Sequence, residues 1–220
     1  MLAAVIFDLD GVLIDSLASI RASMNHALTT LGRPLLVGDE ARAHVGPPLA
    51  KTAPLLVGDD DPALVERFIA IYRAHYRDSA ETTTAAMPDL TQVIPALAER
   101  WPLAIATSKP ELYARPLLEK FGIAGTFRAI CGSSLSHHRD TKATIIGRAL
   151  AALEVSPRDT VVMVGDRSYD VRGAAAHRIP TIGAAYGMGG AEELREAGAK
   201  WLINGLDELP PLLEKLDAAS

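Results

Sequence analysis

The sequence predicts an α/β fold: a parallel β-sheet covered by helices on both faces, with a helical domain inserted after the first strand. Short apolar runs alternate with helical patterns along most of the chain, and each run is apolar at consecutive positions. A strand buried on both faces has this character, whereas a sheet with one exposed face alternates apolar and polar residues. One stretch near the start has helical patterns but no convincing strand. Together these observations favour a Rossmann-like core with a helical insertion.

The expected strands and helices alternate along the core. The first strand covers residues 3–7. Further apolar runs predict strands at 103–107, 128–131, 160–165 and 180–186, with a weaker one at 200–203. Between them, apolar residues at helical spacing predict helices at 111–121, 143–153, 170–177 and 191–197. We expect right-handed connections between the parallel strands and a ligand site beyond their carboxyl ends.

The inserted helical domain is predicted from the pattern of residues 16–80. Apolar residues recur at helical spacing from Leu17 to Leu31, and Gly32 follows as a stop signal. Asp61-Pro62 is a cap and first-turn pair, which predicts the start of another helix.

Two further stretches are expected to interrupt and then end this helical domain. The segment 44–54 is punctuated by Gly and Pro and predicts a break between helical pieces. The polar segment 78–89 predicts the linker that returns to the sheet. We therefore predict a core domain formed by residues 1–14 and 83–220 and an inserted α-helical domain formed by residues 15–82.

Composition argues against several classes of function. Of the 220 residues, 49 % are hydrophobic and 22 % charged, and the net charge is −5; nucleic-acid-binding proteins usually carry a basic excess instead. No apolar run is long enough to span a membrane, and the N-terminus lacks a basic secretory signal. The single cysteine, Cys131, has no disulfide partner in the chain. We expect a cytoplasmic protein without nucleic-acid or membrane partners, and the sequence leaves open whether it is a monomer or a homodimer.

Two carboxylates, Asp8 and Asp10, directly follow the first expected strand and precede Gly11. Residues i and i+2 of an extended chain point to the same side. Their carboxylates therefore repel each other unless one is protonated or a cation lies between them. Mg²⁺ with oxygen ligands is the usual solution in such sites. The glycine permits a tight turn immediately after the pair.

Polar residues also follow other expected strands. Thr107 and Ser108 end one apolar run, where hydroxyl and backbone N–H groups can hold a phosphate. Asp166 follows a later run and can complete a cation site with Asp8. Lys142 opens a helix and offers an ammonium group that would offset phosphate charge. We expect these residues to gather at the same edge of the sheet.

These motifs, in this order, resemble those of the haloacid dehalogenase superfamily, and in particular its phosphoglycolate phosphatase-type phosphatases. DLDGVLID (8–15) is similar to the first family motif, Thr107 in ATSK to the second, Lys142 to the third, and GDRSYD (165–170) to the fourth. GPPL (46–49) is similar to a loop of the helical cap domain in this subgroup. The resemblance covers nearly the whole chain and implies that the inserted helical domain is such a cap.

The resemblance implies a reaction and a role for each matched carboxylate. Asp8 would attack phosphorus and form an aspartyl-phosphate. Asp10 would protonate the leaving group and then activate water for the hydrolysis step. Mg²⁺ would be held by Asp8, the backbone carbonyl of Asp10, and Asp166, with support from Asp170.

A second set of residues would hold the phosphoryl group. By the same resemblance, Thr107 and Lys142 would bind its oxygens, and Ser108 and the backbone at Leu9 would add donors. Gly46, in the cap loop, is the expected phosphate or substrate contact from the cap. The implied substrate is a small phosphorylated metabolite. Phosphoglycolate is the first candidate, and a nucleoside monophosphate, the substrate of a 5′-nucleotidase, is the close alternative.

Several alternatives stay open. The dehalogenase branch lacks an aspartate at the position of Asp10, which favours phosphoryl transfer here. A sugar-phosphate mutase uses much of the same core, and a phosphonatase uses a cap lysine, for which Lys51 lies in roughly the right region. A phosphate-binding regulator without turnover is a further alternative. Asp15 is interpreted as a helix cap, and His137 and His138 as a loop pair rather than a metal site.

Overall fold

The core is a six-stranded parallel sheet with the strand order β5-β4-β1-β6-β7-β8. The computed structural model describes residues 1–135, 140–155 and 160–219. Its strands are β1 (Leu2–Phe7), β4 (Leu103–Pro110), β5 (Ala129–Ser133), β6 (Thr160–Gly165), β7 (Thr181–Ala184) and β8 (Trp201–Ile203). All six expected strands are present, and the expected fold class is confirmed.

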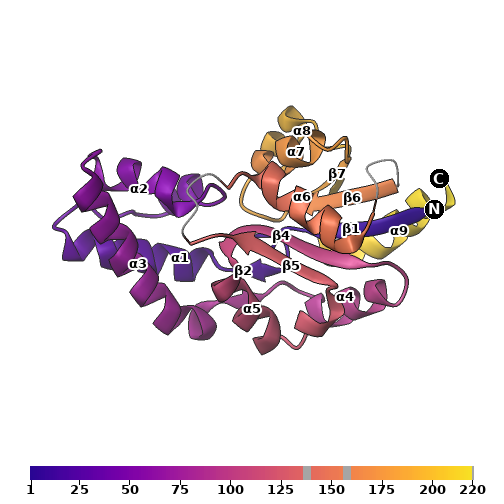
Figure 1. Ribbon diagram of the computed structural model, residues 1–220, viewed down its shortest axis with the longest axis horizontal. Coiled ribbons are helices and arrows are strands. Elements are labelled where there is room, and N and C mark those ends of the chain that lie inside the picture. The colour runs from indigo at the N-terminus through magenta and orange to yellow at the C-terminus, as the bar shows by residue number, and fades with distance from the viewer. Residues whose placement is uncertain (136–139, 156–159, 220) are drawn as a thin grey trace.

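Helices cover both faces of this sheet (Figure 1). On β1, Val5 and Phe7 belong to one apolar cluster, and Ala4 and Ile6 to another on the opposite face. The first face is covered by α4 (Leu90–Ala98), α5 (Glu111–Lys120) and α9 (Leu209–Ala218), and the second by α6 (Lys142–Leu153) and α7 (Ser168–Ala175). The helix α8 (Gly190–Ala197) follows β7. Burial on both faces explains why the strands are apolar at consecutive positions.

The chain between β1 and α4 forms a helical segment at one end of the molecule, opposite the two termini (Figure 1). It contains α1 (Leu17–Thr30), a short 3₁₀ helix (Glu40–His44), α2 (Leu49–Val57) and α3 (Pro62–Thr83). A third apolar cluster, which includes Met24, Leu28, Phe68 and Tyr76, lies within it. We use the name helical segment for α1 to α3; its function as a cap stays a prediction.

The two passages of chain between the core and the helical segment lie side by side. β2 (Ile14–Asp15) pairs antiparallel with β3 (Ala85–Ala86). This short ribbon lies near the two predicted junctions, and the domain boundaries at residues 14/15 and 82/83 stay a prediction. Among the described residues, no helix combines the length and the apolar character needed to cross a membrane.

Two expectations for the helical segment were wrong in extent. The expected break at 44–54 is shorter, because α2 begins at Leu49 and packs Ala53 and Leu56 into the apolar cluster of the segment. The expected linker at 78–89 is helical as far as Thr83. There the hydroxyls of Thr82 and Thr83 donate to the Ser79 carbonyl, so the polar side chains are satisfied within the helix.

Candidate active site

The predicted site residues meet at the carboxyl edge of the sheet. Asp8 directly follows β1, Thr107 lies in β4, and Asp166 directly follows β6. β4 and β6 are the two neighbours of β1, so these three side chains lie at adjacent strand ends. Lys142 is the first residue of α6, whose start faces the same edge.

Asp8, Asp166 and Asp170 form a buried carboxylate cluster, in which one oxygen from each lies within 4.8 Å of the others. The Lys142 ammonium lies 2.8 Å from Asp8 Oδ2 and 2.7 Å from Asp170 Oδ1, and it donates to the Ala106 carbonyl at 3.0 Å. Burial disfavours a charged lysine, but Asp170 and Asp8 more than offset that effect and raise the Lys142 pKa. The Lys142 ammonium therefore forms ion pairs with two of the three carboxylates, Asp8 and Asp170.

The cluster retains an excess of negative charge that a divalent cation would neutralise. Burial raises the pKa of Asp8, with Lys142 opposing the shift, and burial together with Asp170 and Asp8 raises the pKa of Asp166 well above its usual value. Asp166 Oδ1 is buried and has no hydrogen-bond partner among the described residues. An all-oxygen cluster with an unpartnered carboxylate oxygen fits a hard cation such as Mg²⁺.

The backbone around Asp166 is shaped to hold this carboxylate in place. A Cβ atom at Gly11 would lie 2.0 Å from Asp166 Oδ2, and one at Gly187 would lie 2.3 Å from Asp166 Cβ. The Met188 N–H donates to Asp166 Oδ2 at 2.7 Å. Asp170 Oδ2 accepts the Asp166 N–H at 3.1 Å and therefore orders the loop between β6 and α7. Glycines are required because side chains would displace the acid.

Asp10 lies outside the carboxylate cluster and has its own partners. The Ser16 hydroxyl donates to Asp10 Oδ1 at 2.5 Å, and the Lys109 ammonium lies 2.9 Å from the same oxygen. Lys109 also donates to the Tyr76 hydroxyl of α3. Both contacts of Asp10 converge on Oδ1. Burial disfavours the Lys109 charge, but Asp10 and Tyr76 more than offset this effect and raise its pKa.

Sequence reasoning missed Lys109 as a site residue. A usable signal was present: Lys109 stands two residues after Thr107 in an apolar strand, so both side chains point to the same side. Lysine is rarely buried without a partner, and this one is 8 % exposed. Tyr76 could not have been assigned from sequence, because it reaches Lys109 only through the docking of α3 on the core.

The remaining predicted phosphate contacts occupy different positions around Asp8. The Thr107 hydroxyl is buried and accepts the Lys109 N–H at 3.2 Å, and Ser108 lines the cleft above the acids. The Leu9 N–H donates to Asp8 Oδ1 at 2.7 Å, so here it binds the proposed nucleophile. Gly46 lines the same cleft, with φ at 115°.

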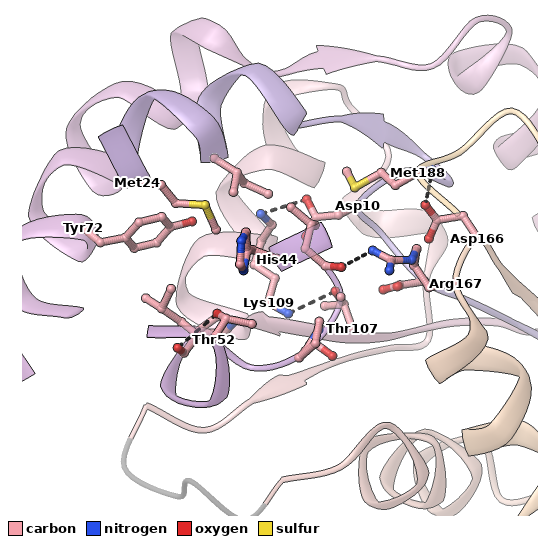
Figure 2. A pocket seen from close by; sticks show the side chains of 18 residues that line it. Asp10, Met24, His44, Thr52, Tyr72, Thr107, Lys109, Asp166, Arg167 and Met188 are labelled. Atoms are coloured by element: carbon pink, nitrogen blue, oxygen red, sulfur yellow. Dashed lines mark hydrogen bonds and ion pairs between the residues drawn. The ribbon is translucent and has the colours of Figure 1, made fainter. Parts of the chain in front are cut away.

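A cleft of about 640 Å³, counting the part open to solvent, lies between the sheet edge and the helical segment. Asp10, Thr107, Lys109 and Asp166 line its core side (Figure 2). The opposite side is formed mainly by residues of α1, α2 and α3 and the chain between them, namely Ile20, Met24, His44, Val45, Pro47, Leu49, Thr52 and Tyr72. The carboxylates therefore face a partly enclosed cleft, one side of which the helical segment forms.

Arg167 is a second residue that sequence reasoning missed. Its guanidinium lies 3.1 Å from Glu193 Oε1 and donates to the carbonyl oxygens of Arg42, at 3.0 Å, and Val45. The Ser168 N–H also donates to Glu193, at 2.7 Å. Burial opposes ionisation of Glu193, but the Ser168 N–H and Arg167 more than offset it and lower the Glu193 pKa. Arg167 thus joins the core to the loop that carries His44 and Gly46.

Other candidates lie outside the cleft. Lys51 is exposed and lines a neighbouring hollow with Tyr169 and Arg172. Asp15 Oδ1 accepts the Leu17 N–H at 3.2 Å, as expected for a helix start, although the capping position itself is Ser16. His137 and His138 lie outside the described residues.

Comparison with known proteins identifies the family. The family model described as haloacid dehalogenase-like hydrolase matches residues 5–184. The chain belongs to the haloacid dehalogenase-like hydrolase family. The resemblance inferred from the four motifs, including its phosphatase members, is therefore confirmed. A crystal structure described as a predicted phosphatase from Clostridium acetobutylicum is 33 % identical, with a TM-score of 0.90, and the match covers 97 % of this chain and 99 % of that one.

Curated relatives carry different activities in their names. The tyrosine-protein kinase PtkA of Mycobacterium tuberculosis is 40 % identical over 190 residues, which are 86 % of this chain but only 64 % of that protein. A 5′-nucleotidase of Pseudomonas aeruginosa is 34 % identical, with 87 % of this chain and 86 % of that one covered. A phosphoglycolate phosphatase of Agrobacterium fabrum is also 34 % identical, with 83 % and 80 % covered. Family membership alone therefore does not decide the substrate.

Proposed function

We propose that this haloacid dehalogenase-like hydrolase is a Mg²⁺-dependent phosphatase that hydrolyses a small phosphomonoester through an aspartyl-phosphate on Asp8. One observation carries the proposal: Asp8 and Asp166, which form a buried cluster with Asp170 and Lys142, line the same cleft as a separate carboxyl group, Asp10. This arrangement provides a nucleophile, Asp8, whose negative charge is offset by Lys142. It also provides a separate carboxyl group, Asp10, that can act as general acid and base.

In the first step, an Asp8 oxygen attacks phosphorus and the phosphorus–oxygen bond to the organic group breaks. Asp10 gives its proton to the departing alkoxide, which leaves as an alcohol. Ser16 and Lys109 both contact Asp10 Oδ1, which orients Oδ2 as the oxygen that carries the proton. The product of this step is an acyl phosphate on Asp8.

In the second step, Asp10 takes a proton from water, and the resulting hydroxide attacks phosphorus. The phosphorus–oxygen bond to Asp8 breaks, orthophosphate is released, and Asp10 is protonated again for the next cycle. Thr107 and Lys142 are proposed to hold the phosphoryl oxygens, with Ser108 as an additional donor. The Leu9 N–H, which binds Asp8 Oδ1 in this structure, is proposed as a further donor once that contact is released. Positioning and charge neutralisation are the main contributions of a protein to phosphoryl transfer.

The proposed metal ligands are Asp8, the backbone carbonyl of Asp10, and Asp166. Asp170 would orient this set through the Asp166 N–H and the Lys142 ammonium. Bound Mg²⁺ supplies positive charge that offsets the repulsion between the carboxylates and the phosphoryl group. The buried, unpartnered Asp166 Oδ1 supports this assignment.

Two substrates are supported by named relatives. Phosphoglycolate is the substrate in the name of the Agrobacterium fabrum relative, and nucleoside monophosphates are the class that a 5′-nucleotidase hydrolyses. The helical segment, proposed as residues 15–82, would act as the cap that covers either substrate. Only a comparison of kcat/KM values across a substrate panel separates them.

A second candidate function is phosphoryl transfer to a tyrosine hydroxyl. The observation that favours it is the 40 % identity with the tyrosine-protein kinase PtkA. The same acyl phosphate on Asp8 would then pass its phosphoryl group to a phenol instead of water. Incubation with ³²P-labelled acetyl phosphate and a tyrosine-containing peptide distinguishes the two functions. The phosphatase releases labelled orthophosphate, whereas the transferase labels the peptide.

The phosphonatase, regulator and mutase functions are less well supported by the cleft. A phosphonatase needs a lysine of the cap in the cleft, but Lys51 is exposed and lines a neighbouring hollow. A phosphate-binding regulator needs no acid or base, yet Asp10 stands in the cleft with oriented partners. A sugar-phosphate mutase would return the phosphoryl group to the sugar, and release of orthophosphate from the substrate would argue against it.

The decisive experiment replaces the proposed nucleophile. Asp8→Asn should abolish Mg²⁺-dependent phosphate release from an aryl phosphate ester while circular dichroism and the cooperative unfolding transition are preserved. Asp15→Asn is the matched control, because Asp15 is exposed and its carboxylate only accepts the Leu17 N–H; this variant should retain turnover. Wild-type turnover by the Asp8 variant would remove Asp8 as the nucleophile.

A further inference from the structure

The wall of the cleft that faces the carboxylates is largely apolar. Ile20 and Met24 of α1, Leu49 of α2 and Tyr72 of α3 line it. Figure 2 shows Met24 and Tyr72 on the side of the cleft opposite Asp166 and Met188. If Asp8 binds the phosphoryl group, this wall receives the organic group that leaves. Such a wall stabilises an apolar organic group through surface burial, but it provides no partner for a charged group of the substrate.

The two strongest cations of the cleft are already engaged. Lys109 contacts Asp10 at 2.9 Å and donates to the Tyr76 hydroxyl. Arg167 contacts Glu193 at 3.1 Å and donates to backbone carbonyl oxygens. A carboxylate or second phosphate on the substrate could pair with Lys109 or Arg167 only by breaking one of these existing pairs, which is costly.

His44 is the remaining basic side chain of the cleft lining, and no ion pair involves it among the described residues. It lies at the end of the short 3₁₀ helix, where the loop toward Gly46 begins. A histidine can donate a hydrogen bond to a neutral hydroxyl or carbonyl group as readily as to a carboxylate. His44 therefore admits a polar group on the substrate without requiring a charge there, and it is tested separately below.

The cleft offers suitable surfaces for a ring. Its apolar wall contains an aromatic side chain, Tyr72, and a thioether, Met24. Tyr72 is held rigidly, because its ring stacks on Phe68 and Tyr76 with centroid distances of 6.5 and 5.6 Å. Met24 adds a polarizable thioether, which packs well against aromatic rings.

We propose that the organic group of the substrate is uncharged and carries an apolar ring, which packs against Met24, Leu49 and Tyr72, and that the cleft discriminates against a second anionic group. This inference rests on the proposed phosphatase function and narrows its substrate class. It favours a nucleoside or an aromatic alcohol over glycolate as the leaving group.

The test compares kcat/KM for benzyl phosphate, n-propyl phosphate and phosphoglycolate, with acetyl phosphate as a reference. The first three have primary alkoxide leaving groups, so differences among them report mainly on the organic group. Acetyl phosphate is an activated anhydride, so its hydrolysis should depend little on contacts between its organic group and the apolar wall. We expect benzyl phosphate to exceed n-propyl phosphate by about tenfold and phosphoglycolate by about a hundredfold, the scale of selectivity that apolar pockets and unpaired charges produce.

Each outcome decides the matter. The expected order supports the inference. If acetyl phosphate turns over but phosphoglycolate equals or exceeds benzyl phosphate, the inference is wrong and the proposed function stands. If none of the four compounds releases phosphate in the presence of Mg²⁺, the proposed function is wrong, and the inference that rests on it is wrong as well.

Variants locate the selectivity in the wall. In the Met24→Arg variant, kcat/KM for phosphoglycolate should exceed kcat/KM for benzyl phosphate by about tenfold. The Met24→Leu variant should preserve the wild-type order of the two substrates. Because Met24 is buried at 2 % exposure, Leu49→Arg, at a half-buried position, provides the same test with less risk to folding. Ratios measured on one preparation do not depend on its active fraction. Unchanged ratios in both arginine variants would contradict the inference.

The variant His44→Gln tests whether His44 binds a carboxylate of the substrate. If His44 binds a substrate carboxylate, this variant loses activity with phosphoglycolate but not with benzyl phosphate, and that result would overturn the inference. Equal effects on both substrates support it. A comparison of benzyl phosphate with a nucleoside 5′-monophosphate then distinguishes the two sources of the ring, because both have primary alkoxide leaving groups but one carries an aromatic ring and the other a nucleoside.

Discussion

The Lys109 ammonium lies 2.9 Å from Asp10 Oδ1 and also donates a hydrogen bond to the Tyr76 hydroxyl. It therefore joins the proposed general acid in the core to α3 in the helical segment. The same ammonium lies 4.6 Å from the centroid of the Tyr76 ring, which adds a cation–π contact. Asp10 therefore has one partner, Lys109, that is itself bound to α3, and a second partner, Ser16, at the start of α1.

Lys109→Met should lower kcat by about a hundredfold, because Asp10 loses the partner that orients it for proton transfer. Removing one partner of this largely buried ion pair should also lower the free energy of unfolding by about 3 kcal/mol. Lys51→Met is the control, since Lys51 is exposed and outside the cleft. Tyr76→Phe, which removes only the hydroxyl, should lower kcat by no more than about fivefold. A Lys109→Met enzyme with wild-type kcat would refute an orienting role.

Mg²⁺ should stabilise the protein in a pH-dependent manner. Burial raises the folded-state pKa values of Asp8 and Asp166 above the ordinary value of 3.8. The metal-free folded state therefore binds more protons than the unfolded state above that pH and loses stability as the pH rises through the raised values. Mg²⁺ binds the ionised carboxylates, so its affinity should weaken as the pH falls through the same window.

The measurement for this metal prediction is thermal unfolding with Mg²⁺ and with EDTA. At a concentration of about 100 times Kd, Mg²⁺ should add about 2.7 kcal/mol to the free energy of unfolding. Asp166→Asn should abolish the Mg²⁺-dependent rise in Tm, whereas Asp60→Asn, at an exposed position, should retain it. An equal rise in both variants would argue against a metal site at Asp166.

Gly11→Ala should damage the metal site as well as the fold. Gly11 has φ of 81°, and a Cβ atom there would lie 2.0 Å from Asp166 Oδ2. Gly32→Ala is the matched control, because Gly32 has φ of 64° but an open surrounding. The control should lose about 1 kcal/mol of unfolding free energy through backbone strain alone. Gly11→Ala should lose more and should also lose the Tm rise with Mg²⁺, as measured by denaturant and thermal unfolding.

Glu193→Gln should destabilise the protein at neutral pH by about 1–2 kcal/mol, because the charged acceptor of Arg167 and the Ser168 N–H is lost. The folded-state pKa of Glu193 is below its ordinary value of 4.5. Its ionisation therefore stabilises the folded state above pH 4.5, and this contribution disappears as the pH falls through the lowered value. Urea unfolding at pH 7 and at pH 4 should show the difference from wild type shrinking. Glu192→Gln, at an exposed neighbour, should show little difference at either pH.

The core and the carboxylate cluster followed from local patterns. Consecutive apolar residues predicted every strand of the sheet, because burial on both faces dictates that pattern. The acids at the ends of the β1 and β6 strands converge because parallel strands present their carboxyl ends at one edge. The extent of α2 and α3 was misjudged, because packing of Ala53 and Leu56 and the hydroxyl contacts with Ser79 outweighed local Gly, Pro and polar signals.

The sequence by itself determined the sheet, the position of the helical insertion, and the residues gathered at the edge where the strands end. Only the tertiary structure decided which residues hold Asp10 and what surface faces it. Lys109 and Tyr76 are 33 residues apart, and Arg167 reaches the Val45 carbonyl across 122 residues. Such contacts depend on how α1 to α3 dock on the core, whereas strand and helix patterns arise from neighbours a few residues apart.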